Sequence, residues 1–124
     1  MNSSIIHQYK IYKSYEERRA ESTKIMQKFR DRLPIIVERV KNSKIAIIDK
    51  NKYLVPMDLT IGQFMLIIRN RIKLNESIAM FININSFIPH THYLISEIYA
   101  KYKDPDGFLY IFYTGENTFG LHRI

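Results

Sequence analysis

The spacing of apolar and polar residues predicts a long helix near the start of the chain. Residues 1–13 are polar with scattered apolar side chains, and we expect a short helix there. Ser14 and Glu17 then form a capping box, in which each side chain bonds the backbone N–H of the other residue. The helix is predicted to run to about Phe29, before the break at Pro34. Its expected packing face comprises Tyr15, Ser22, Ile25, Met26 and Phe29.

A second capping box, Thr60 with Gln63, predicts another helix that runs to about Lys73. The side chains that recur at helical spacing and mark a core face are Ile61, Phe64, Met65, Ile68 and Ile72. Ile67 and Arg71 lie one turn apart on another face. They are compatible with a groove that has a cationic rim, and equally with an exposed isoleucine beside a solvated arginine.

Four apolar segments have the composition of strands: 33–40, 50–56, 78–84 and 108–114. In the last one Phe108, Tyr110 and Phe112 point to one face, and the residues between them, also apolar, point to the other. Both faces need covering, so this strand is predicted to be central.

The turn at residues 88–91 introduces a fourth, short helix. Thr91 is its expected cap, and the helix is predicted from His92 to about Lys103 with Leu94, Ile98 and Tyr102 facing inward. The order of elements indicates an α+β domain in which one crossing helix covers one face of a mixed sheet and the 14–29 helix shields the other.

The segment 50–56, with sequence KNKYLVP, has the properties of an edge strand. Pro56 has no N–H to give to a ladder, and charges such as Lys50 and Lys52 discourage edge-to-edge pairing of two copies. The same lysines would attract an extended acidic peptide, which makes this a candidate docking strand. The alternative is an ordinary internal strand flanked by solvated lysines.

Composition favours one globular domain of 124 residues with a sizeable core. The chain has no cysteine, which excludes disulfides, zinc–thiolate sites and a cysteine nucleophile. No apolar run approaches membrane-spanning length and residues 1–11 lack a signal-peptide core, so we expect neither a span nor secretion. Any membrane attachment would have to be added to the chain.

The positive charge is concentrated in the first part of the chain. Residues 1–73 hold 16 Lys and Arg against 7 Asp and Glu, whereas residues 74–124 hold 3 against 5. Acidic peptides, anionic membranes and nucleic acid are the partners that this charge permits. The basic residues match no RNA-binding signature, so no specific nucleic-acid partner is expected.

An enzyme is not expected, since no nucleophile motif, phosphate loop or metal spacing occurs. His90 and His92 are two potential metal ligands beside a proline turn, and two ligands rarely suffice. We therefore expect no catalytic residue, no metal site and no cofactor.

Several segments together resemble one family. They are the sequences RAES at 19–22, KYLVP at 52–56, DLTIGQF at 58–64, KDPDGFLY at 103–110 and GENTFG at 115–120. With these, the chain between about Tyr15 and Gly120 resembles the autophagy-related ubiquitin-like modifiers, the family of the microtubule-associated-protein light chain and the GABA-receptor-associated protein, and most of all their fungal member. The resemblance implies a ubiquitin-like β-grasp fold with two additional N-terminal helices. It divides the chain into an N-terminal segment (1–13), the ubiquitin-like domain with its helical extension (14–114) and a flexible tail (115–124).

The resemblance also implies binding of linear motifs of the form aromatic, any, any, aliphatic, added as a strand beside residues 52–55. The pocket for the aromatic residue would consist of Glu21, Ile25, Pro34, Lys52, Leu54 and Phe108. The pocket for the aliphatic residue would consist of Tyr53, Val55, Pro56, Leu59, Phe64, Ile67 and Arg71. Arg32 and Lys50 would contact acidic residues that precede the motif.

The resemblance further implies conjugation. A dedicated cysteine protease would cut after Gly120, and activating and conjugating enzymes would join that glycine to phosphatidylethanolamine. The protein would then be cytoplasmic, and on autophagosome membranes once it carries the lipid. In the family, processing and activating enzymes use the face that Phe81 and Asn83 occupy here, and Asn83 departs from the usual apolar residue. A motif-binding scaffold that never receives lipid and a basic nucleic-acid-binding module are the alternative functions.

Overall fold

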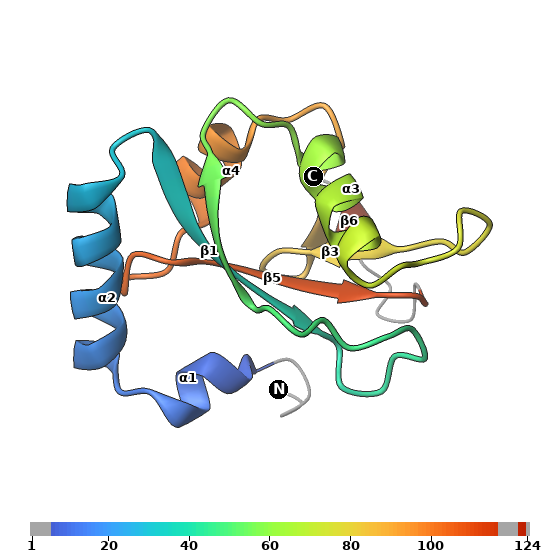
Figure 1. The fold of residues 1–124 in the computed structure, drawn as a ribbon, viewed down its shortest axis with the longest axis horizontal. Helices are drawn as coiled ribbons and strands as arrows, with labels where there is room; N and C mark the ends of the chain where they lie inside the picture. The colour runs from blue at the N-terminus through green and yellow to red at the C-terminus, as the bar shows by residue number, and fades with distance from the viewer. Residues whose placement is uncertain (1–5, 117–121, 124) are drawn as a thin grey trace.

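The computed structural model describes residues 6–116 and 122–123. Two helices, α1 (Gln8–Tyr12) and α2 (Tyr15–Lys28), precede the first strand, β1 (Arg32–Arg39). The chain continues through β2 (Lys52–Pro56), α3 (Ile61–Arg71), β3 (Phe81–Asn83), β4 (Phe87–Ile88), α4 (Ile95–Tyr102), β5 (Leu109–Thr114) and β6 (His122–Arg123). Figure 1 shows α1 and α2 on one side of the sheet and α3 on the other.

The four-stranded sheet has the order β2-β1-β5-β3. β1 and β2 are antiparallel, β1 and β5 are parallel, and β3 runs antiparallel to β5. All six residues of β5 are buried, so the prediction of a central strand that is apolar on both faces is confirmed. The predicted α+β fold, a β-grasp with two additional N-terminal helices, is likewise confirmed.

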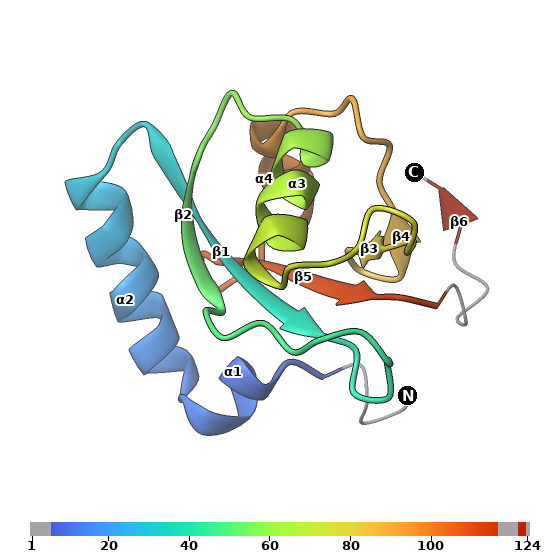
Figure 2. The ribbon, with the colours of Figure 1, turned by 45° about the vertical axis from the view of Figure 1, so that its right-hand side comes forward.

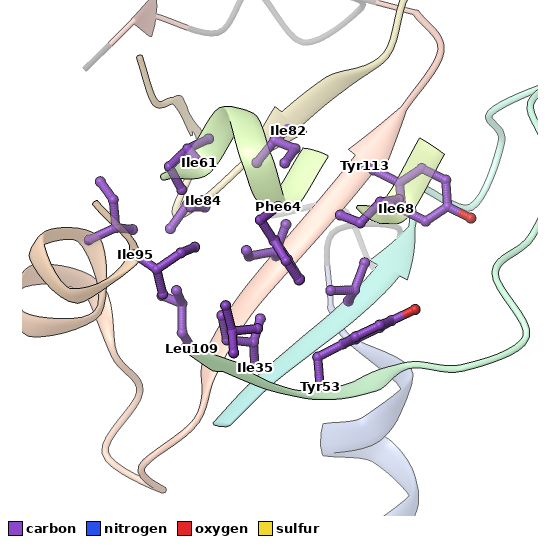
Figure 3. Packing of buried hydrophobic residues seen from close by; sticks show 14 of the residues in the cluster. Ile35, Tyr53, Ile61, Phe64, Ile68, Ile82, Ile84, Ile95, Leu109 and Tyr113 are labelled. Atoms are coloured by element: carbon purple, nitrogen blue, oxygen red, sulfur yellow. The ribbon is translucent and has the colours of Figure 1, made fainter. Parts of the chain in front are cut away.

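Side chains of the central strands alternate between two cores. Ile35, Leu109 and Ile111 belong to the larger core, together with buried side chains of α3 and α4 (Figure 3). On the opposite face, Ile36 and Tyr110 pack in a smaller cluster with Tyr9 of α1 and Phe108. α1 and α2 therefore cover the face of the sheet that α3 and α4 leave open.

Both predicted capping boxes are present. Ser14 Oγ accepts from Glu17 N at 3.1 Å while Glu17 Oε1 accepts from Ser14 N at 3.0 Å. Thr60 Oγ1 accepts from Gln63 N at 3.1 Å, and Gln63 Oε1 accepts from Thr60 N at 2.9 Å. These bonds satisfy N–H groups that the first helical turn leaves free, which explains why α2 and α3 begin at these positions.

The prediction that Thr91 caps the short helix after the turn at 88–91, which is α4 in the structure, is wrong. The carbonyl of Thr91 accepts from Gly62 N at 2.9 Å, and residues 91–93 form a turn and a bend before Leu94, the residue that precedes α4. Glu97 Oε1 accepts from Leu94 N at 2.9 Å, which caps α4 three residues later than predicted. The inward face shifts with it to Ile95, Ile98 and Tyr99.

Two further predictions need correction. Tyr15 and Met26 of α2 are exposed rather than packed. The third predicted strand is confined to β3, and β4 follows it and overlaps at Ile88 with the turn predicted at residues 88–91. His122–Arg123, within the predicted flexible tail, pair with β4 as β6, while Gly120 lies outside the described residues.

Candidate functional site at the free edge of the sheet

β2 forms one edge of the sheet, and within the described residues only β1 pairs with it. Val37 N donates to Asn51 O at 2.7 Å, so Val37 and Asn51, which lie opposite each other in the register, form a hydrogen-bonded pair. Because bonded and non-bonded pairs alternate, Tyr53 and Val55 bond to β1, and the backbone groups of Lys52 and Leu54 point away from the sheet. Pro34 opposes Leu54 at a non-bonded pair, where its missing N–H costs nothing.

β2 lies between α2 and α3 (Figure 2). Side chains along a strand point alternately to its two faces. Lys52 and Leu54 are half-buried, whereas Tyr53 and Val55 are buried in the larger core beneath α3. A strand added here would therefore meet α2 on one side and α3 on the other.

The six predicted aromatic-pocket residues come from α2, β1, β2 and the residue before β5. Phe108 is fully buried, and Ile25 packs against the cluster to which it belongs. Leu54 pairs with the buried Pro34 across the two strands. The fold thus gathers on one side of β2 six residues that are up to 87 positions apart in the sequence, from Glu21 to Phe108.

A polar network borders this side. Glu21 Oε1 accepts a hydrogen bond from Tyr9 Oη, and Glu21 Oε2 pairs with Lys52 Nζ. Lys13 Nζ lies 3.6 Å from Glu21 Oε1. The ring of Tyr9 stacks edge-on against Phe108 with centroids 5.4 Å apart. Tyr9 and Lys13 were missed by the sequence reasoning, which offered no signal that α1 would fold back onto this site.

The predicted aliphatic-pocket residues lie along β2 and α3. The ring of Tyr53 packs edge-on against Phe64 with ring centroids 5.6 Å apart, and Figure 3 shows both side chains in the larger core. Leu59 packs against this core and Pro56 is half-buried at the end of β2. Ile67 is 41% exposed, so it offers apolar surface beside the buried floor.

Arg71 is held by Asp49, a residue that was not predicted. Arg71 Nε and Nη2 donate to the two carboxylate oxygens of Asp49 at 2.7 and 3.0 Å. The hydrogen bond from Arg71 holds the pKa of Asp49 below its usual value. This bidentate pair orients the guanidinium beside the start of β2.

The two residues predicted to contact acidic groups lie at opposite ends of β2. Arg32 Nη1 donates to the outward carbonyl of Leu54 at 3.4 Å, a weak bond. Lys50 is exposed, and its ammonium lies 4.9 Å from the ring centroid of Tyr53. Tyr113 Oη accepts from Ile48 N and donates to Ala46 O, both at 2.7 Å, and so fixes the segment that carries Lys50.

Phe81 and Asn83 lie on β3, at the opposite edge of the sheet. Asn83 is 6% exposed, and its Oδ1 accepts from Ser86 N at 2.8 Å. Asn85 and Ser86 have positive φ angles of 50° and 69°, so the amide stabilises a tight turn. This turn is a structural reason for an asparagine at that position.

His90 and His92 stack on each other with ring centroids 5.4 Å apart. The described part of the chain contains no group of three or more His, Asp or Glu side chains arranged to hold a metal ion. None of its helices combines the length and apolar character needed to cross a bilayer.

Comparison with known proteins identifies the family. A family model described as "Autophagy protein Atg8 ubiquitin like" matches residues 17–120. Autophagy-related protein 8 of Scheffersomyces stipitis is 56% identical over 116 residues, which cover 94% of this chain and 84% of that protein. The Candida albicans protein of the same name is 56% identical over 113 residues, which cover 91% and 84%.

Two solved structures share the fold. Trypanosoma brucei ATG8 has a TM-score of 0.85 and 41% identity, covering 88% of this chain and 94% of that one. Plasmodium falciparum Atg8, solved in complex with a Plasmodium falciparum Atg3 peptide, has a TM-score of 0.82 and 34% identity, covering 90% and 98%. The resemblance inferred from the sequence motifs is confirmed: the chain belongs to the Atg8 family of ubiquitin-like autophagy proteins.

Proposed function

We propose that this chain is a ubiquitin-like modifier that docks aromatic-x-x-aliphatic motif peptides as an added strand at β2. The observation that carries the proposal is the free edge itself. The backbone N–H and C=O groups of Lys52 and Leu54 point outward, and α2 and α3 flank them. Main-chain bonds to such an edge supply adhesion that does not depend on the peptide sequence.

Selection would come from the side chains on either side of the edge. Alternate residues of an added strand face the same way, so two motif residues three positions apart reach different sides of β2. One would meet Ile25 and Phe108 and the other would meet Tyr53 and Ile67. Lys50, Lys52 and Arg32 would attract acidic residues next to the motif.

The relative from Plasmodium falciparum supports a peptide-binding role, since it was solved with an Atg3 peptide. We infer that the conjugating enzyme of this pathway is one of the proteins that present such a peptide to this chain. A short peptide buries less surface than a standard protein interface, so we expect dissociation constants on the order of micromolar. Such values correspond to a binding free energy of about −8 kcal/mol.

The decisive test is a double variant of the edge, Lys52→Ala with Leu54→Ala. We expect it to abolish binding of a motif peptide in titration calorimetry while the circular dichroism spectrum stays unchanged. Lys101→Ala with Ile78→Ala removes one lysine and one exposed aliphatic side chain elsewhere, and should bind normally. Unchanged binding by the edge variant would refute the site.

The second part of the proposal is conjugation through Gly120 to phosphatidylethanolamine, after a cysteine protease removes residues 121–124. A glycine suits an enzyme cleft because it has no Cβ and leaves its carboxyl group unhindered. The two acyl chains of the lipid meet the requirement for stable anchoring on an autophagosome membrane. The protein acts in this scheme as the transferred group rather than as an enzyme.

Intact mass separates conjugation from the scaffold alternative. Incubation with the processing protease should remove the mass of residues 121–124, and a Gly120→Ala variant should stay off membranes in cells. A Gly120→Ala variant that still becomes membrane-bound would defeat this part of the proposal without affecting peptide binding in vitro.

A further inference from the structure

A second basic surface lies away from β2, between α2 and the segment that joins α4 to β5. A cavity of about 650 Å³ opens there, and Figure 1 shows that segment passing beside α2. We name it the α2–α4 cleft. The lining residues that carry the argument are Arg19, Thr23, Met26, Gln27, Arg30 and Lys103.

The hydroxyl groups on the floor of the cleft already donate their protons to backbone carbonyls. Ser22 Oγ donates to the carbonyl of Asp106, and Tyr99 Oη donates to the carbonyl of Gly107 at 2.6 Å. Gly107 has a φ of 94°, and a Cβ there would lie 2.3 Å from Ser22 Oγ, so only glycine lets the two walls approach this closely. A ligand must therefore be recognised by the rim.

The rim is cationic. No ion pair within residues 6–116 involves Arg19, Arg30 or Lys103, and all three are exposed. Asp104 is the one carboxylate among the lining residues, and Lys10 and Arg18 already neutralise it. The cleft thus presents a net positive field to an incoming molecule.

The spacing of the cations sets the length of the ligand. Arg19 lies in α2 and Arg30 lies two residues beyond Lys28, the last residue of the helix; the nine helical steps from Arg19 to Lys28 alone cover about 14 Å at 1.5 Å per residue. One phosphate or carboxylate cannot reach both. An extended peptide advances about 3.3 Å per residue, so a segment of about five residues spans the gap.

Between the two arginines the wall is neutral and partly apolar. Met26 is 36% exposed, and Thr23 and Gln27 lie on the same side of the helix. A thioether adapts to aliphatic side chains of different shape. We propose that the α2–α4 cleft binds an extended acidic peptide segment of a partner protein, about five residues long, with an aliphatic residue between acidic ends.

The test uses a fluorescein-labelled peptide of sequence Glu-Asp-Glu-Leu-Asp-Glu, which has no aromatic residue and so is no ligand for the motif site at β2. Fluorescence anisotropy at low salt should show binding that weakens at physiological ionic strength of about 0.15 M, because exposed charges are screened. Arg30→Glu with Lys103→Glu should weaken binding at least about tenfold, since charge reversal at the contact sites opposes the ligand.

The matched control is Lys24→Glu with Lys28→Glu, which makes the same change in net charge on faces of α2 that do not line the cleft. It should change affinity less than about threefold, as expected for a charge that acts only through the general field. The edge variant Lys52→Ala with Leu54→Ala should bind the peptide normally, so this inference stands or falls separately from the motif site.

A measurement on the unaltered protein guards against misfolded variants. In nitrogen–proton correlation spectra the amides of Thr23 and Gln27 should shift on addition of the peptide, and those of Lys52 and Leu54 should not. The proposal would be overturned if both charge-reversal double variants lost the same affinity for the peptide. It would also be overturned if the peptide shifted only amides of β2. Tighter binding of a single-stranded oligonucleotide of equal charge at the same amides would overturn it in favour of nucleic acid.

Discussion

The buried carboxylate of Asp106 is one of the contacts that hold α2 against the rest of the domain, and its removal should be costly. Asp106 is fully buried. Its Oδ2 pairs with Arg18 Nη1 and accepts from Tyr110 Oη, while Oδ1 accepts from Phe108 N at 2.8 Å. Burial raises the pKa of Tyr110, so its hydroxyl remains a proton donor to this carboxylate.

Asp106→Asn keeps the shape of the side chain and removes its charge. The guanidinium of Arg18, 11% exposed, would then lose its main counter-ion in a poorly hydrated place. Breaking a buried pair in this way costs about 3–5 kcal/mol. Arg18 keeps a bond from Nε to Lys13 O at 3.2 Å and lies 3.9 Å from Asp104, so we expect the lower limit, about 3 kcal/mol.

Thermal unfolding followed by circular dichroism measures this loss. For a domain of this size, about 3 kcal/mol corresponds to a fall in Tm of roughly 10 °C. The control is Asp58→Asn, an exposed carboxylate with no side-chain hydrogen bond or ion pair among the described residues, which should leave Tm unchanged. A fall of less than about 3 °C for Asp106→Asn would refute the reasoning, because it would mean that the buried charge is already compensated.

Further predictions concern the helices and one turn. Thr60→Ala removes the cap of α3 and should lower the free energy of unfolding by about 1 kcal/mol in urea titration, whereas Thr60→Ser should not. Gly107→Ala should destabilise by at least about 1 kcal/mol, because its φ of 94° and the contact with Ser22 both oppose a side chain. Burial lowers the pKa of His7 in the folded protein below 6.5, the value expected in the unfolded chain. As the pH drops below 6.5, the unfolded chain therefore takes up a proton before the folded protein does, and the free energy of unfolding should fall. His7→Gln should flatten that part of the stability–pH curve, and an unchanged slope would contradict the role of His7.

Local patterns were sufficient for most of the elements. The Ser14–Glu17 and Thr60–Gln63 capping boxes located the starts of α2 and α3, because a cap is a contact between residues three positions apart. The fully apolar strand at 108–114 placed β5 at the centre, because two buried faces leave no other position. The start of α4 was predicted wrongly, since Gly62 binds the carbonyl of Thr91, and a pattern within one segment does not contain that long-range bond.

The sequence by itself determined the starts of α2 and α3, the central strand, the basic first half and the residues along β2. Only the tertiary structure decided which of them meet. Tyr9, Asp49 and Asp106 hold Glu21, Arg71 and α2 in place through contacts that join distant parts of the chain. The physical reason is that periodicity reports which face of an element is apolar, whereas the partner across that face depends on the path of the whole backbone.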